Sequence, residues 1–357
     1  MKLETGNWKL ETCKSILVRA PNWLGDNVLA LPAVAALCRM RPAAHVTVLV
    51  RDTMADFWRM TPAHDVIPFR AQRGLAGLAD RWRLARELRQ HGFGSALILP
   101  NSFDSALIPW LARIPRRVGW ASDARGALLT ERVPRPEHLR GQNQSLCYLY
   151  LVEQFLGERV TDSNDCRLKI AQAAIDAVQA RSAALPALLL GLNPGATYGA
   201  AKCWLPERFA EVAVQAHAEL GAGVLIVGGP GDARVCAEVA QLIARQAPDA
   251  AIWCLNLAGQ TNLCELAAWL RQCACLVTND TGGMHLAAVA GTRVVAIFGP
   301  TDWRETAPLG EGHVLLRGDV DCAPCCKREC ATDHRCMTAV TVAQVWQAVQ
   351  GMLPSRR

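Results

Sequence analysis

The chain has 357 residues, 51% of them hydrophobic and 20% charged, with a formal net charge of +6. That length predicts two domains, while the absence of a roughly 20-residue apolar run and of an apolar core near the start argues against a membrane span and a signal peptide. The charge suits an anionic substrate or surface but falls short of that of a dedicated nucleic-acid-binding protein. We therefore expect a cytoplasmic protein in which most of the fifteen cysteines are thiols.

The chain opens with a predicted strand at Ser15–Ala20, a loop, and a helix from about Val28 to Met40. A further strand at Val46–Val50 makes this the opening of a doubly wound α/β sheet. The loop, PNWLGDN, contains one glycine and lacks the G-x-G-x-x-G pattern that holds a dinucleotide against a helix. A nicotinamide or flavin site is therefore disfavoured.

Asp26 stands where this loop meets the helix. A helix cap is the commoner role for an aspartate in that position. The alternative is a carboxylate at the mouth of an inter-domain cleft, where it takes a proton from a substrate hydroxyl. The residues alone leave both roles open.

The rest of the first half is rich in arginine. A helix is predicted at Leu75–Gln90, a strand at Ala96–Pro100 and an apolar helix near Ala106–Ala112. The stretch Arg113–Arg140 then holds seven arginines and three acidic residues. Such a run is usually a solvated face, but arginine also binds carboxylates and phosphates through forked hydrogen bonds, which would suit an acidic acceptor.

A second strand–loop–helix unit begins at Leu188–Leu192, after a connecting segment at Val160–Ala187. Its loop, NPGATYGAAK, carries the hydroxyl of Thr197 and the mobile charge of Lys202, which together suit a pyrophosphate. A solvated loop lysine is the alternative. Two units that open in this way imply two similar domains facing across a cleft.

Later loops add candidate nucleotide contacts. Asp232 follows a predicted strand at Val224–Val227 and is placed to accept hydrogen bonds from ribose hydroxyls, although a turn or cap role is at least as common. The loop around Leu257 and Gly259 precedes a predicted helix at Leu263–Gln272. Backbone groups of such a loop can read the edge of a base.

The stretch Cys275–Asp302 reads as strand, loop, helix, strand and loop. Between its first strand and its helix, cap-type residues meet two glycines that allow a tight turn. This arrangement places backbone N–H groups and the positive end of a helix dipole at the carboxyl edge of a strand, which is a site for a phosphate. Alone, the pattern is as typical of an ordinary α/β turn.

Six segments spread over nearly the whole chain carry a resemblance to a known family. They are ILVRAPNWLGD (16–26), LPNSFDSAL (99–107), RVGW (117–120), NPGATYGAAKCWL (193–205), LAGQTNL (257–263) and TNDTGGMHLAAV (278–289). In this order they resemble the bacterial ADP-heptose:lipopolysaccharide heptosyltransferases, and most of all heptosyltransferase II.

The resemblance implies an α/β fold of the GT-B type, with two Rossmann-like domains facing across a cleft. Residues 1–180 would bind the acceptor, residues 181–340 would bind the nucleotide sugar, and a helix within residues 341–357 would pack back on the first domain. The implied activity is a glycosyltransferase reaction that moves heptose from ADP-L-glycero-D-manno-heptose to the heptosyl-Kdo inner core of lipopolysaccharide. The transfer would proceed with inversion. It would need no metal in catalysis, because Lys202 and a helix end would offset the charge of the departing ADP.

The resemblance also assigns residues. Asp26 becomes the general base and Lys202 the residue that holds the donor diphosphate. We expect Asp280 to cap its helix and to accept a sugar hydroxyl, because its charge would repel a phosphate. The expected donor contacts are Thr197, Lys202, Asp232, Leu257, Gly259, Asp280, Thr281, Gly282, Gly283 and His285, and the expected acceptor contacts are Asn101, Ser102, Arg117 and Trp120.

The implied partners are ADP-heptose and a lipid A–Kdo inner-core acceptor. They would be met at the cytoplasmic face of the inner membrane, through peripheral contact by the basic first domain. The alternatives within the family are heptosyltransferases I and III and a protein-modifying heptosyltransferase. A nucleotide-binding oxidoreductase would need the missing glycine fingerprint, and a nucleic-acid-binding module would leave two apolar domains without a role, so we expect no nucleic acid partner.

Five cysteines fall within Cys322–Cys336, with His334 nearby. The pattern C-x₂-C-x₄-C-x₅-C offers four soft ligands of the kind that zinc or iron sites use. We expect a structural metal finger there, with free thiols or one or two disulfides as the alternative. The expected ligands are Cys322, Cys325, Cys330 and Cys336.

Overall fold

The computed structural model describes residues 14–70, 74–161 and 166–353. The segment on which the signal-peptide expectation rests, residues 1–13, lies outside these ranges. Contacts within the chain divide it into two units, Met1–Cys166 and Arg167–Arg357. This division falls before the expected boundary at residue 180, because helix α6 (Gln172–Ser182) packs on α9 (Leu263–Gln272) of the second unit.

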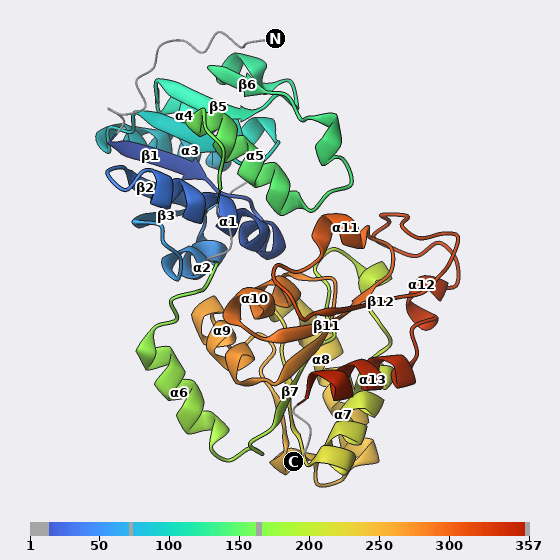
Figure 1. Cartoon of the computed structure of the whole chain (residues 1–357). Helices are drawn as coiled ribbons and strands as arrows, with labels where there is room; N and C mark the ends of the chain where they lie inside the picture. The colour runs from blue at the N-terminus through green and yellow to red at the C-terminus, as the bar shows by residue number, and fades with distance from the viewer. Residues whose placement is uncertain (1–13, 71–73, 162–165, 354–357) are drawn as a thin grey trace. The chain divides into compact units, whose positions relative to one another are not determined.

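The first unit is built on a six-stranded sheet in which all paired strands are parallel, in the order β3-β2-β1-β4-β5-β6 (Figure 1). Its central strands are continuous apolar runs, as expected for strands that helices cover on both faces. The strands are β1 (Ser15–Arg19), β2 (His45–Arg51), β3 (Asp65–Phe69), β4 (Ser95–Ile98), β5 (Arg116–Trp120) and β6 (Glu131–Val133).

Helices cover both faces of this sheet. Two of them, α1 and α5, pack on each other, and α3 packs on α4. One core lies between α3, α4 and the sheet, where Leu17, Leu88 and Ile98 are buried. The helices are α1 (Leu24–Met40), α2 (Ala55–Arg59), α3 (Gly74–Gln90), α4 (Phe103–Leu111) and α5 (Gln144–Leu156).

The second unit has its own six-stranded parallel sheet, in the order β12-β11-β10-β7-β8-β9. Counted from its first strand, this is the order 3-2-1-4-5-6 of the first unit, the doubly wound Rossmann order. The strands are β7 (Leu189–Asn193), β8 (Gly223–Ile226), β9 (Cys254–Asn256), β10 (Cys275–Asn279), β11 (Arg293–Phe298) and β12 (Val314–Arg317). The expected α/β fold of two Rossmann-like domains is confirmed, while the cleft between them stays a prediction.

The larger core of the second unit lies under α7, α8 and α13, and a smaller one under α6 and α9. The C-terminal helix α13 begins with a capping box between Thr341 and Gln344 and packs on α7 and on strands of its own sheet. Its expected packing on the first domain stays a prediction. The remaining helices are α7 (Pro206–Leu220), α8 (Ala233–Gln246), α10 (Gly282–Ala290), α11 (Trp303–Thr306), α12 (Arg335–Thr338) and α13 (Val342–Met352).

The strand order locates the sites. In each sheet the order reverses between two neighbouring strands, β1 and β4 in the first unit and β7 and β10 in the second. Ligands of doubly wound sheets bind at the carboxyl ends of such a pair, where the loops diverge to opposite faces. Within the described ranges, no helix has the length and apolar composition needed to cross a bilayer.

Candidate active site

The switch point of the first unit carries a pocket of 320 Å³ that brings four predicted residues together. Asp26 follows β1, Asn101 and Ser102 follow β4, and Trp120 ends β5. Trp120 is nearly buried and stacks on Tyr150 with 6.3 Å between ring centroids, so its position is fixed. The other lining residues are Pro21, Asn22, Trp23, Leu99, Pro100, Arg135, Gln144, Cys147 and Tyr148.

Asp26 lies in the first turn of α1, whose cap is Trp23 rather than an acidic side chain. An anion is favoured there by the positive end of the helix dipole. Tyr148 of α5 lines the same pocket, and burial, together with the charge of Asp26, raises the pKa of its hydroxyl well above the usual value. Arg135 opposes that shift. The pocket therefore groups a carboxylate, a neutral phenol and a guanidinium.

The arginine-rich stretch is only partly a solvated face: Arg113, Arg132, Arg135 and Arg140 are exposed, whereas Arg116 and Arg125 are buried. Arg125 is fully buried and donates to the carbonyl oxygens of Pro100 and Trp120 and to Ser105 Oγ. Burial lowers the pKa of its guanidinium to about 10. Arg125 thereby fixes the loop after β4, a role that sequence reasoning missed, since nothing in the residue pattern marks which of the seven arginines are internal.

The structure does not bring Arg117 to this pocket. Its Nε donates to the Leu128 carbonyl oxygen at 2.7 Å, and its Nη1 donates to that of Ile114. Burial lowers the pKa of the Arg117 guanidinium. Arg135, which sequence reasoning did not single out, is the arginine that lines the pocket beside Asp26.

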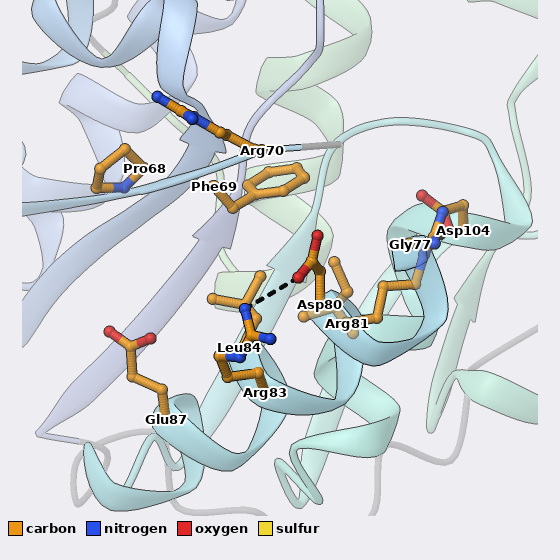
Figure 2. Close-up of a pocket in the computed structure, with 11 residues that line it drawn as sticks. Pro68, Phe69, Arg70, Gly77, Asp80, Arg81, Arg83, Leu84, Glu87 and Asp104 are labelled. Atoms are coloured by element: carbon orange, nitrogen blue, oxygen red, sulfur yellow. Dashed lines mark hydrogen bonds and ion pairs between the residues drawn. The ribbon is translucent and has the colours of Figure 1, made fainter. Parts of the chain in front are cut away.

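A second pocket of the first unit, of 360 Å³, lies at the end of β3 between α3 and α4 (Figure 2). Its arginines are paired with carboxylates: Arg81 Nε lies 2.6 Å from Asp104 Oδ1, and Arg83 Nη1 lies 3.0 Å from Asp80 Oδ1. None of the predicted site residues lines it. Its charges therefore balance one another, and it offers no excess charge to a ligand.

At the switch point of the second unit, Lys202 and Asp280 form a buried ion pair. Lys202 Nζ lies 2.7 Å from Asp280 Oδ2 and 3.3 Å from the Asp280 carbonyl oxygen. Thr301 Oγ1 also donates to that carboxylate, at 2.6 Å. An ammonium group has three N–H donors, so two bonds to Asp280 leave one for a ligand.

Asn279, at the end of β10, ties down both ends of the loop that carries Lys202. Its Nδ2 donates to the Pro194 carbonyl oxygen at 2.7 Å, and its Oδ1 accepts the Trp204 N–H at 2.9 Å. The side chain is fully buried, so both bonds are shielded from water. We call residues 194–205 the β7–α7 loop. Sequence reasoning saw in Asn279 only a cap-type residue.

The turn into α10 corrects one expectation. The N-cap of α10 is Thr281, without a side-chain cap, and the Asp280 carboxylate bonds Lys202 and Thr301 instead of capping the helix. Gly283 is required, because a Cβ there would lie 2.1 Å from Asn193 Nδ2. The first N–H groups of a helix lack intrahelical acceptors, so Thr281, Gly282 and Gly283 offer an anion-binding edge.

His285 is buried in α10 beside this ion pair. Burial lowers the pKa of its imidazole to about 4; Asp280 opposes the shift and Lys202 adds to it. The ring is therefore neutral at pH 7. Its Nδ1 has no hydrogen-bond partner among the described residues.

The other predicted donor residues lie on loops at this edge. Asp232 Oδ2 accepts the Gly229 N–H at 2.9 Å, and burial raises the pKa of its carboxyl. The Leu257 side chain is buried, and its N–H donates to the Ile226 carbonyl oxygen. Gly259 is exposed and donates its N–H to Gly228, and Thr197 is exposed in the β7–α7 loop.

The cysteine-rich segment, residues 322–336, is here called the cysteine loop. Cys322, Cys325 and Cys330 are exposed thiols and Cys336 is buried. Burial raises the pKa of the Cys336 thiol, and the charges of Cys322, Cys330 and Cys325 raise it further, so all three lie within electrostatic range of Cys336. Among the described residues, however, no group of three or more His, Cys, Asp or Glu side chains is arranged to hold a metal ion.

Comparisons with known proteins agree with this arrangement. Residues 81–335 match the family model of glycosyltransferase family 9 (heptosyltransferase). Lipopolysaccharide heptosyltransferase 2 of Salmonella typhimurium strain LT2 is 31% identical over 313 residues, which cover 85% of this chain and 87% of that protein. The protein of the same name from Escherichia coli K12 is 29% identical over 322 residues, covering 85% and 87%.

Solved structures show the same relationship. E. coli ADP-heptose LPS heptosyltransferase II has a TM-score of 0.80 and 26% identity, covering 95% of this chain and 98% of that one. A family 9 glycosyl transferase from Veillonella parvula DSM 2008 has a TM-score of 0.83 at 22% identity, covering 95% and 97%. The second match speaks for the fold alone.

Proposed function

The chain belongs to glycosyltransferase family 9, the heptosyltransferases, and from that premise we propose that it moves heptose from ADP-heptose to the inner core of lipopolysaccharide. It is a glycosyltransferase, and its relatives that match over 85% of the chain are named heptosyltransferase 2. The observation that carries the proposal is the placement of a carboxylate pocket at one switch point and a lysine with a helix N-terminus at the other.

In this proposal the second unit binds the donor. The remaining N–H of Lys202 and the backbone N–H groups at Thr281–Gly283 hold the diphosphate. Asp280 orients Lys202 and is kept away from the phosphates by its bonds to Lys202 and Thr301. Neutral His285, with its open Nδ1, and the loops that carry Thr197, Asp232, Leu257 and Gly259 surround the rest of the nucleotide sugar.

The first unit then binds the acceptor and supplies the base. An acceptor hydroxyl oxygen attacks C1 of the heptose while Asp26 takes its proton, and the bond between C1 and the β-phosphate oxygen breaks, so ADP leaves with the electron pair. One displacement inverts the configuration at C1. Asn101, Ser102 and Trp120 border the same pocket as Asp26 and are proposed to position the acceptor.

The charge that develops on ADP is offset by groups of this chain, so the proposed step uses no metal. The cysteine loop is proposed to hold a structural zinc or iron. Support comes from residue type and neighbourhood, since Cys322, Cys325 and Cys330 all raise the pKa of Cys336. Among the described residues no coordination geometry is assembled there, so a bound ion would have to draw the four thiols together.

The metal is testable by elemental analysis of protein purified without air, before and after a chelator. Cys330→Ser should lose a stoichiometric zinc or iron, whereas Cys326→Ser, which removes a cysteine of the same loop outside the proposed ligand set, should keep it. Wild-type protein that contains no stoichiometric zinc or iron would refute the metal finger.

We also propose peripheral contact with an anionic membrane surface through α3. Leu78 and Trp82 lie one helical turn apart and are 50% and 57% exposed, and Arg86 follows one turn later. An exposed apolar pair beside arginines suits an anionic bilayer. Trp82→Ala should reduce cosedimentation with vesicles containing anionic phospholipid. The control Trp303→Ala, at an exposed tryptophan of the second unit, should not. Equal vesicle binding by the wild type and both variants would refute the proposed membrane contact.

The central experiment is transfer from ADP-heptose to inner-core acceptors truncated at successive sugars. Product should form on a heptosyl-Kdo acceptor and not on one that ends at Kdo. Transfer to the Kdo-terminated acceptor would indicate a heptosyltransferase I activity, transfer only to longer cores a heptosyltransferase III activity, and transfer only to a polypeptide a protein acceptor. No transfer to any of them, with no stabilisation by ADP, would overturn the proposal.

A further inference from the structure

The cysteine loop packs directly on the β7–α7 loop that carries Lys202. The Ala201 N–H donates to the Arg328 carbonyl oxygen at 3.0 Å, and the Ala201 carbonyl oxygen lies 2.9 Å from His334 Nε2. The Tyr198 hydroxyl donates to the Cys326 carbonyl oxygen at 2.8 Å. Three hydrogen bonds thus join two segments that are more than 120 residues apart in the sequence.

Gly199 makes this approach sterically feasible. A Cβ at that position would lie 2.3 Å from the Arg328 carbonyl oxygen, which is backbone and cannot move aside alone. The glycine therefore lets the backbone of Arg328 lie against the loop beside the predicted phosphate-binding lysine. The side chain of Arg328 therefore begins beside the loop that carries Lys202.

The Arg328 guanidinium lies against the ring of Tyr198, on the same loop as Lys202. Its carbon lies 5.3 Å from the ring centroid of Tyr198, and Lys202 Nζ lies 4.9 Å from the same centroid. Cation–π attraction holds both cations against one aromatic ring. The Tyr198 ring thus contacts a second positive charge, from a distant part of the sequence, in addition to that of Lys202.

A second positive charge would strengthen diphosphate binding at this site. Lys202 is already paired with Asp280, so together these two side chains carry no net charge. A departing diphosphate would then meet one N–H of Lys202 and the partial charge of the α10 N-terminus, but no uncompensated full charge from these groups. Among the described residues Arg328 has no carboxylate within ion-pair distance, whereas Arg304 and Arg335 are paired with Asp302 and Asp333.

We propose that Arg328 is a catalytic residue that binds the β-phosphate of the donor and stabilises the departing ADP. This rests on the proposed function and adds a residue to it. As the bond between heptose C1 and the β-phosphate oxygen breaks, the electron pair stays on that oxygen, and the N–H groups of Arg328 take up the new charge. Arginine suits this role because its planar fork binds two phosphate oxygens at once.

The test compares binding of ADP and of AMP, which lacks the β-phosphate, in Arg328→Ala, Arg328→Lys and the control Arg335→Ala. The control removes the same charge from the same loop, but its guanidinium bonds Asp333. Arg328→Ala should weaken ADP binding about tenfold or more and leave AMP binding unchanged. Arg328→Lys should recover part of that loss, and Arg335→Ala should bind both nucleotides as the wild type does.

Turnover provides the second measurement. With ADP-heptose and a working acceptor, Arg328→Ala should lower kcat more than it raises KM for the donor, because the new charge develops in the transition state. Equal weakening of ADP and AMP would show that Arg328 only holds the loop, and unchanged ADP binding and turnover would show no role. Either result overturns the inference while wild-type transfer activity still supports the proposed function.

Discussion

The two units share one strand order but treat charge at their switch points in opposite ways. In the first unit, Asp26 sits in the first turn of a helix and lines an accessible pocket with polar and aromatic neighbours. In the second, Lys202 and Asp280 are buried in a mutual pair, fixed by a loop that Asn279 ties at both ends.

The difference follows from the work proposed for each unit. A base must reach the proton of an incoming hydroxyl, which requires an accessible carboxylate. A leaving-group site must hold its charges in place before the reaction, because preorganised charges need no reorientation as the bond breaks. The same topology therefore supports an open and a rigid site, and the loops after the strands decide which one forms.

The largest effect is expected in the first unit. Asp26→Asn removes the base while keeping the shape of the side chain, so transfer should fall roughly 100- to 10,000-fold. ADP binding, which belongs to the second unit, should be unchanged. The control Asp56→Asn makes the same change in the first turn of another helix. Substantial turnover by Asp26→Asn would contradict the assignment of the base.

In the second unit, Lys202→Met should cost stability as well as donor binding. It leaves the Asp280 carboxylate buried without its partner, which destabilises a protein by about 3–5 kcal/mol. The double variant Lys202→Met/Asp280→Asn removes both charges and should regain most of the unfolding free energy, measured in denaturant, but not ADP binding. If the double variant bound ADP normally, Lys202 would not be a phosphate ligand.

The rigid site should also make stability depend on pH through His285. Its pKa is about 4 in the folded protein because of burial, and about 6.5 in the unfolded chain. The folded state favours the neutral ring, so this contribution is complete above pH 6.5 and is lost as the pH falls to about 4. The loss should be about 3 kcal/mol.

The measurement is denaturant unfolding of wild type and His285→Asn between pH 7 and 4. The difference in unfolding free energy between the two proteins should shrink as the pH falls, because the variant lacks the titrating ring. A difference that stays constant over this range would show that His285 is not held neutral.

The smallest effect is expected at the junction of the β7–α7 loop and the cysteine loop. Tyr198→Phe removes the bond from the hydroxyl to the Cys326 carbonyl oxygen and keeps the ring that Lys202 and Arg328 face. It should lower the unfolding free energy by about 1 kcal/mol. ADP binding should change little, whereas Tyr198→Ala should weaken it, and equal ADP binding by both variants would show that the ring does not organise the cations.

The accuracy with which the sequence predicted the secondary structure differs from one element to another. The helix Leu263–Gln272 was predicted to the residue, because its pattern of apolar residues lies within one short window. Strand β5 was missed, because Arg116 and Arg117 open it. Arg116 is buried there only because Glu131 and the Phe155 carbonyl oxygen, both distant in sequence, accept its N–H donors.

By itself, the sequence determined the α/β class, the two strand–loop–helix units and the identity of the groups on their loops, because each depends on residues within one short window. Only the tertiary structure decided that Lys202 is neutralised by Asp280, that Arg125 is internal, and that Arg328 faces Tyr198. Each of these is a pairing between segments far apart along the chain. Burial then sets their electrostatics, and burial exists only once the sheets and helices have packed.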